Sequence, residues 1–132
     1  MSEQASTTAT HQLSLRKDLS ELALVALGAG PGAVMRWQIG SHLRGNDVIV
    51  NVLGAFLLGW LVGLPFRPRR QLLVGIGFCG SLTTFSSWMV NCVSFIAQGD
   101  WLAALGLIGL TLGLGLGAAA LGVFVGRSLV RR

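Results

Sequence analysis

The chain has 132 residues, of which 52% are hydrophobic and only 11% are charged, and its mean hydropathy is +0.69. A soluble domain needs a charged shell of about a quarter of its residues, so this composition excludes a soluble globular protein and indicates a membrane protein. Ten basic and five acidic residues give a formal charge of +5. The basic residues flank apolar segments and form no basic face with interleaved aromatic rings, which favours lipid headgroups over nucleic acid as their partner.

Residues 1–18 are polar and rich in Ser, Thr and Gln, which predicts a disordered N-terminal tail rather than a signal peptide. Four apolar segments follow in residues 19–132, each meeting or slightly exceeding the roughly 17 to 25 residues that a bilayer requires. These segments are residues 19–40, 48–64, 72–97 and 101–126. The connections "SHLRGND", "PFRPRRQ" and "QGD" are short, so neighbouring spans must run antiparallel. The pattern predicts an all-α membrane protein with four transmembrane helices.

Basic residues are distributed unevenly between the two ends of the predicted bundle. The end that carries both termini has Arg16, Lys17, Arg67, Arg69, Arg70, Arg127, Arg131 and Arg132. The opposite end has only Arg36 and Arg44. Because loops rich in Lys and Arg stay on the cytoplasmic side, we expect both termini to be cytoplasmic and the chain to lie in the inner (plasma) membrane.

Two polar residues stand within the first two predicted spans. Arg36 lies in the last turns of the first span, where it either snorkels to the interface or draws anions toward a pore mouth. Asn51 opens "NVLGAFLLG" in the second span, and its amide either bonds another helix or donates to an anion. In the first span Pro31 predicts a kink, and its surroundings, "GAGPGA", lack the context of a dinucleotide-binding loop.

Glycines recur at the four-residue spacing that lets helix backbones pack closely in membranes. The pairs are Gly28 with Gly32, Gly59 with Gly63, Gly109 with Gly113, Gly113 with Gly117, and Gly122 with Gly126. Four helices of this size cannot enclose a wide pore and its packing shell, so we expect the chain to form oligomers.

The third span contains the stretch "FCGSLTTFSSW", residues 78–88. A straight helix of its roughly 26 residues would measure about 39 Å against a hydrocarbon core of about 30 Å. Gly80 and the hydroxyl residues that follow it are where an interruption would cost least, and the freed carbonyls would suit a cation. Phe85 and Trp88 share one face, where they either pack in the core or present ring edges to an anion. Cys79 and Cys92 are expected to be small buried hydrophobic residues.

Three segments, "GAVMRW", "NVLGAFLLG" and "GFCGSLTTFSSW", together resemble the small fluoride channels, the Fluc or CrcB family. The resemblance implies a fluoride-selective channel, not an enzyme, that exports fluoride passively through an antiparallel dimer with two pores. It implies a structural sodium ion held by the backbone carbonyls of Gly80 and Thr83. The pore residues that it implies are Asn51, Phe85, Trp88, Ser86, Thr84, Thr111 and Arg36.

The chain departs from the family pattern at several positions. Trp88 stands where the family usually has a second Phe, Ser81 replaces the usual second Gly, and the hydroxyl track of the fourth helix is reduced to Thr111. Many members of the family have balanced topology signals and form homodimers, whereas this chain has eight basic residues against two. The chain could form either a homodimer or a heterodimer. Our hypothesis is a heterodimer with a homologous, oppositely oriented subunit.

Two other functions fit four short spans. A proton-coupled multidrug exporter needs a carboxylate in the membrane, and the acidic residue that we identify near a span is Glu21, at the start of the first. A non-conducting structural subunit would show no fluoride flux and no effect of changes at Asn51 or Phe85. Enzymatic activity is not expected, because no phosphate-binding loop, metal-ligand cluster or activated nucleophile is present, and His11 and His42 lie in the tail and a loop.

Overall fold

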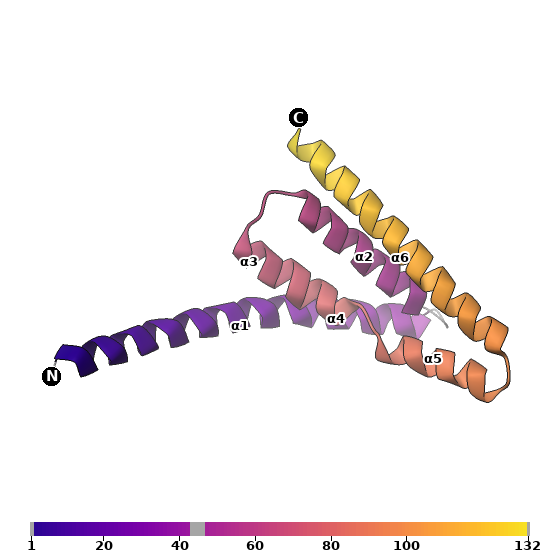
Figure 1. Cartoon of the computed structure of the whole chain (residues 1–132), viewed down its shortest axis with the longest axis horizontal. Helices are drawn as coiled ribbons and strands as arrows, with labels where there is room; N and C mark the ends of the chain where they lie inside the picture. The colour runs from indigo at the N-terminus through magenta and orange to yellow at the C-terminus, as the bar shows by residue number, and fades with distance from the viewer. Residues whose placement is uncertain (1, 43–46, 132) are drawn as a thin grey trace.

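The computed structural model describes residues 2–42 and 47–131 (Figure 1). Its elements are α1 (Ser2–His42), α2 (Asp47–Gly63), α3 (Pro68–Arg70), the π-helical segment η1 (Gln71–Cys79), α4 (Gly80–Leu82), α5 (Ser86–Ala97) and α6 (Trp101–Val130). The described residues contain no strand, which confirms the all-α class. Among them, Ser14–His42, Pro68–Ala97 and Trp101–Val130 are long and apolar enough to cross a membrane. The apolar helix α2 is shorter, with 17 residues.

Helix α1 is one continuous helix of 41 residues, about 60 Å long, and its N-terminal part extends beyond the other helices (Figure 1). It includes residues 2–18, for which the sequence predicted a disordered tail. Because this segment contains neither Gly nor Pro, no residue interrupts the helical hydrogen bonds before the apolar span begins. The helix also continues through Pro31.

Helices α2 and α6 pack with their backbones in direct contact. A side chain added at Gly59 would collide with the backbone of Ala119, and one added at Gly122 would collide with the Phe56 carbonyl oxygen. Gly63 and Gly126 approach each other in the same way one turn further along. The close packing that the sequence predicted for Gly59 with Gly63 and for Gly122 with Gly126 is therefore confirmed. This packing positions the whole length of α2 against α6.

Helix α1 packs against η1 through the predicted pair Gly28 and Gly32, which face the backbone of Leu73 and Phe78. The remaining predicted glycines behave differently. Among the described residues, nothing packs within 4 Å of a Cβ added at Gly109, Gly113 or Gly117 of α6, so none of the described helices packs there. The packing predicted for these three glycines is not made within the part of the chain that the structure describes.

The buried core of the described chain is small and lies between α2, η1, α4, α5 and α6. The predicted burial of Cys79 and Cys92 is confirmed, and both are free thiols. By contrast, large apolar side chains cover the outside, and Leu102 of α6 is 82% exposed. An apolar exterior over a thin core is what a lipid solvent permits, because lipid tails are as apolar as leucine.

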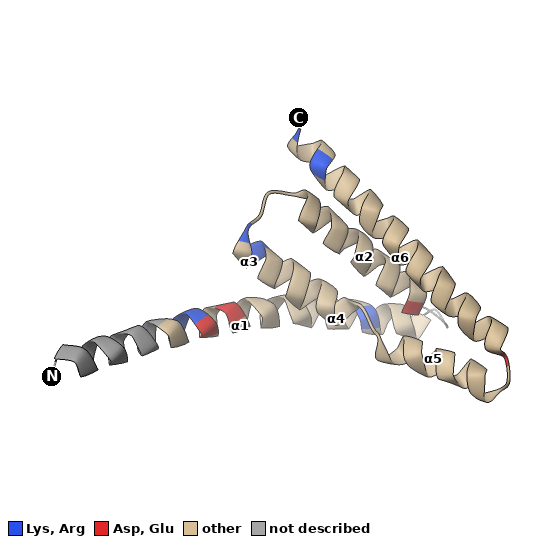
Figure 2. Ribbon diagram, in the orientation of Figure 1, with Lys and Arg blue, Asp and Glu red and all other residues tan. Residues whose placement is uncertain are grey.

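Local sequence explains where the last two helices meet. Gly99 adopts φ +81°, a left-handed conformation that favours glycine, and it ends α5. Asp100 then caps α6 by accepting a hydrogen bond of 3.0 Å from the Ala103 amide. At the opposite end of the molecule, basic residues gather on α3, on the first half of α1 and at the end of α6 (Figure 2).

The α2–α6 contact yields a stability prediction. Gly122→Leu would force the two backbones apart, and overpacking of this kind costs about 1–3 kcal/mol of unfolding free energy. We expect a lower melting temperature in detergent, measured by circular dichroism. Gly115→Leu, on the same helix with open space around it, is the control and should melt like the unmodified chain; equal losses in both variants would contradict the packing.

Candidate functional site

The candidate site is built around an interruption in the third apolar stretch. Helix α4 ends at Leu82, Thr83 is extended at φ −73° and ψ 155°, and α5 begins at Ser86. The Thr83 amide still donates to the Cys79 carbonyl at 3.0 Å, so helical hydrogen bonding continues from η1 through α4 up to that point. The predicted interruption of this span is therefore confirmed at Thr83 and Thr84, whereas Gly80 and Ser81, which the prediction also included, remain helical in α4.

Asn51 of α2 takes over the backbone hydrogen bonds that the interruption removes. Its Oδ1 accepts from the Thr84 amide at 2.8 Å, and its Nδ2 donates to the Thr84 carbonyl at 2.9 Å. In an unbroken helix the Thr84 amide would instead donate to the Gly80 carbonyl. The interhelical role of Asn51 is thus observed, and one of its two Nδ2 hydrogens remains for another acceptor.

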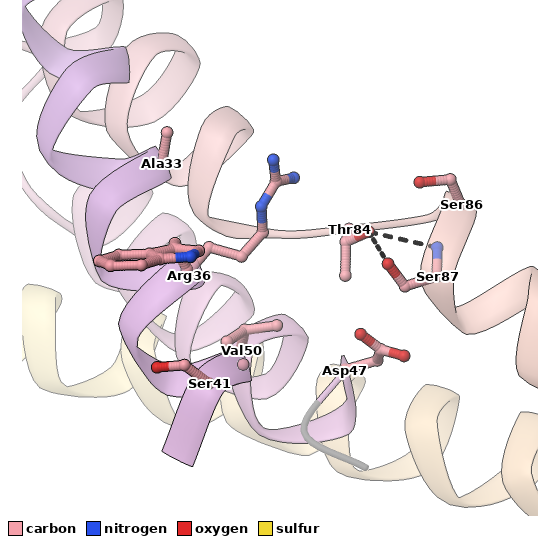
Figure 3. A pocket seen from close by; sticks show the side chains of 10 residues that line it. Ala33, Arg36, Ser41, Asp47, Val50, Thr84, Ser86 and Ser87 are labelled. Carbon is pink, nitrogen blue, oxygen red and sulfur yellow. Dashed lines mark hydrogen bonds between the residues drawn. The ribbon is translucent and has the colours of Figure 1, made fainter. Parts of the chain in front are cut away.

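The hydroxyl groups around the interruption mostly bond to backbone groups of their own segment. Ser81 donates to the Gly77 carbonyl at 2.8 Å, and Thr83 donates to the Cys79 carbonyl at 2.9 Å. The Thr84 hydroxyl lies 3.2 Å from the Ser87 hydroxyl, to which it donates, and accepts from the Ser87 amide at 3.4 Å (Figure 3). These contacts stabilise the last turn before the interruption and the first turn after it.

One pocket, the aromatic pocket, lies beside the interruption and has a volume of about 440 Å³. Its lining residues are Asn51, Ala55, Leu58, Thr83, Thr84, Phe85, Trp88, Thr111 and Leu112. The rings of Phe85 and Trp88 are tilted by 52° with centroids 5.6 Å apart. Phe85 is 69% exposed in the single chain.

Trp88 is fixed in this pocket by a hydrogen bond across α5 and α6. Its Nε1 donates to the Thr111 hydroxyl at 3.1 Å, and that hydroxyl donates to the Leu107 carbonyl at 2.7 Å. The extra N–H that Trp88 brings, relative to a phenylalanine, therefore has a partner within the protein. What the pocket offers at this position is the ring, whose edge is electropositive.

A second pocket, the arginine pocket, has a volume of about 520 Å³ (Figure 3). Its lining residues are Ala33, Arg36, Trp37, Gly40, Ser41, Asp47, Val50, Thr84, Ser86 and Ser87. Arg36 reaches from α1 toward the interruption, where its Nη1 forms a long hydrogen bond of 3.4 Å with the Thr83 carbonyl. Among the described residues the one ion pair joins Lys17 and Glu21, so no carboxylate pairs with the Arg36 charge.

The two pockets meet at Thr84, which is 7% exposed and lines both. All seven predicted pore residues line one or both of them. Arg36 and Ser86 belong to the arginine pocket, and the remaining four belong to the aromatic pocket together with Thr84. Of the two predicted sodium ligands, Thr83 lines the aromatic pocket, whereas Gly80 lies outside both pockets and is exposed.

The sequence reasoning missed several residues of the arginine pocket, among them Asp47 and Ser87. Asp47 is the first residue of α2, where a carboxylate favours the helix N-terminus, and its Oδ2 accepts from Asn91 at 2.7 Å. An acidic residue directly before an apolar helix was the available signal. Ser87 lies within the quoted hydroxyl stretch, but only the fold shows that it lines the pocket beside Thr84.

An interrupted apolar helix flanked by two pockets defines the class of this chain as an all-helical membrane protein with a polar site inside its spans. The family described as "CrcB-like protein, Camphor Resistance (CrcB)" matches residues 23–123. The chain therefore belongs to the CrcB family, as the sequence resemblance predicted.

Several relatives are similar to this chain over most of its length. It is 68% identical over 115 residues to "Fluoride-specific ion channel FluC 2" of Parasynechococcus marenigrum (strain WH8102), covering 87% of each chain. It is 65% identical over 115 residues to the protein of the same name from Synechococcus sp. (strain CC9605), again covering 87% of each. A more distant relative, "Fluoride-specific ion channel FluC 1" of Prochlorococcus marinus (strain SARG), is 36% identical over 113 residues, covering 86% of this chain and 87% of the relative.

The Asn51–Thr84 pair can be tested directly. Asn51→Leu leaves a buried amide and carbonyl of Thr84 without partners, which should lower the free energy of unfolding by about 2–4 kcal/mol. Hydrogen exchange at the Thr84 amide should also become faster. Asn91→Leu removes an exposed hydrogen bond to Asp47 and is the matched control; unchanged exchange at Thr84 in Asn51→Leu would contradict the assignment.

Proposed function

We propose that this protein is a fluoride-specific ion channel that exports fluoride passively across the cell membrane and so reduces fluoride toxicity in the cytoplasm. The observation that carries the proposal is the meeting of two pockets at the buried Thr84, within an interrupted span. The relatives that are 65–68% identical over most of their length, and are named fluoride-specific ion channels, support it.

The chemistry of the two pockets suits a small, strongly hydrated anion. The unpaired charge of Arg36 would attract an anion into the arginine pocket. At Thr84 the remaining N–H of Asn51 and the nearby hydroxyl groups would replace part of its water shell. The electropositive edge of Phe85 would then hold the anion without a buried cation, which would bind it too tightly to release it.

Passive export is sufficient for detoxification. Fluoride enters acidified cells as neutral HF, dissociates in the cytoplasm and is trapped there as an anion. A selective pathway down its electrochemical gradient then removes it without ATP. A proton-coupled exporter would need a carboxylate within the membrane. Asp47 does not meet this need, because it is the first residue of α2 and accepts a hydrogen bond from Asn91.

We further propose that α2 is a fourth span and that the working unit is an antiparallel dimer with two pores. Phe85 is 69% exposed, and Gly109, Gly113 and Gly117 of α6 contact none of the other helices that the structure describes. A second copy, or a homologous subunit, packed on these surfaces would close the aromatic pocket and use the unpacked glycines. The 17-residue length of α2 is at the lower limit for a span.

A structural sodium ion fits the same arrangement. The Gly80 carbonyl has lost its helical partner to Asn51, and Gly80 itself is exposed. The neutral carbonyl oxygens of Gly80 and Thr83 are hard ligands of the kind that bind such cations. When bound, the ion would supply positive charge that holds the interrupted segments of two subunits together.

The distribution of charge supports one orientation in the inner membrane, with both termini in the cytoplasm. A chain that inserts in one direction needs an oppositely oriented partner to form an antiparallel dimer. We therefore propose a heterodimer with a homologous subunit. Relatives with the numbered names FluC 1 and FluC 2 are consistent with such a pair.

The role of the ring edge yields a flux prediction. Phe85→Ile replaces the electropositive edge with an aliphatic group, which should slow fluoride efflux from liposomes that hold this chain together with a homologous subunit about tenfold or more, measured with a fluoride electrode. Phe124→Ile, at an equally exposed ring on α6, should leave efflux unchanged. Dimer content is compared by crosslinking, and equal efflux from both variants would show that Phe85 does not line the pathway.

The proposed heterodimer yields a second flux prediction. We expect liposomes containing this chain alone to release little fluoride, because all its copies share one orientation. Adding a homologous subunit of opposite charge bias should raise the rate severalfold, again read with a fluoride electrode. A conducting antiparallel homodimer purified from this chain alone would refute the heterodimer while leaving the channel function intact.

A further inference from the structure

A third pocket lies far from the interruption, at the end of the molecule that carries the basic residues. Helix α1 forms one wall, and the connection from α2 to η1 forms the other. We call it the basic pocket, and its volume is about 730 Å³, larger than either pocket of the candidate site. Neither the fluoride chemistry nor the helix packing described above uses it.

The charge of the basic pocket is strongly positive. Lys17, Arg67, Arg69 and Arg70 line it, against one carboxylate, Glu21. Glu21 lies 4.0 Å from Lys17 in an exposed pair, so within the described chain no carboxylate pairs with the three arginines. Exposed pairs of this kind contribute little energy, and the local charge therefore remains available to an anion.

Arg70 carries an unsatisfied donor at this site. Its Nη2 donates to the Pro65 carbonyl, which fixes the guanidinium against the connection. Its Nε is buried and has no hydrogen-bond partner among the described residues. Because a buried N–H without an acceptor is costly, an anionic oxygen bound beside the guanidinium would complete its hydrogen bonding.

Apart from Ser20, the rest of the pocket is apolar. Leu24 and Leu72 line it, and Phe66 is 76% exposed beside them. A pocket for a soluble anion would not need these side chains, whereas an amphiphile would cover them with its hydrocarbon. The pocket also lies near the start of the apolar stretches Ser14–His42 and Pro68–Ala97, at the depth of lipid headgroups.

From these observations we propose that the basic pocket binds an anionic phospholipid. The phosphate would lie among Arg67, Arg69 and Arg70, and the acyl chains would begin along Phe66 and Leu72. Basic pockets between transmembrane helices are known to bind such headgroups. The ligand would link α1 to the α2–η1 connection, and its binding does not depend on fluoride transport.

The test measures lipid binding to the full chain and not flux. The protein is purified in detergent, and native mass spectrometry measures binding of phosphatidylglycerol and of phosphatidylcholine with the same acyl chains. We expect phosphatidylglycerol to be retained preferentially. The double variant Arg67→Gln/Arg69→Gln should weaken its binding on the order of 25-fold, about fivefold for each removed cation.

The control is Arg127→Gln/Arg131→Gln, which removes the same charge at the same end of the molecule from a different pocket. It should weaken phosphatidylglycerol binding less than about threefold. Equal losses in the two double variants, or equal binding of the two lipids, would overturn the proposal. Displacement of the lipid by millimolar inorganic phosphate would also overturn it, in favour of a site for soluble anions.

Folding is checked independently of the ligand. The side chains of Arg67 and Arg69 make no hydrogen bond within the described residues, so their replacement should not alter the melting temperature in phosphatidylcholine. Lys17→Gln, on the opposite wall, provides a second variant and should weaken phosphatidylglycerol binding about fivefold. Unchanged binding in Lys17→Gln would overturn the proposed position of the headgroup between the two walls.

Discussion

The structure depends on one constraint, that a backbone group inside hydrocarbon must have a hydrogen-bond partner. Interrupting a helix at Thr83 and Thr84 would leave an amide and a carbonyl without one. Asn51 supplies both partners at once, at 2.8 and 2.9 Å. This reciprocal pair of hydrogen bonds makes the interruption possible in the membrane. The two pockets of the candidate site lie beside the interruption and meet at Thr84.

The same pair explains why the site lies between α2 and the third apolar stretch. Helix α2 is placed by its glycine contacts with α6, and this packing holds Asn51 at the level of Thr84. Trp88 and Thr111 join α5 to α6 on the other side. Thr84 is thereby fixed between two pockets of different character, one with an arginine and one with aromatic rings.

The charged end of the molecule follows from a different constraint. Pro65 keeps α2 from continuing as helix, and Pro68 starts the next helix, α3. Arg67 lies in the connection between them and Arg69 and Arg70 lie in α3, so the three basic side chains gather near α1. The polar site in mid-span and the basic pocket at the interface are therefore built by separate segments. The mid-span site depends on hydrogen-bond partners for interrupted backbone groups, and the basic pocket depends on its position at the headgroup level of the bilayer.

The sequence by itself determined the helical class, an interruption in the stretch that follows Gly80, and seven of the residues that line the two pockets. It did so because hydropathy, glycine spacing and hydroxyl residues in an apolar span are local signals. The helical conformation of residues 2–18, the two hydrogen bonds of Asn51 to Thr84, and the presence of Asp47 in the arginine pocket came only from the tertiary structure. Partners far apart in the chain are set by how helices pack, and no spacing in the sequence encodes which backbone group an amide will meet.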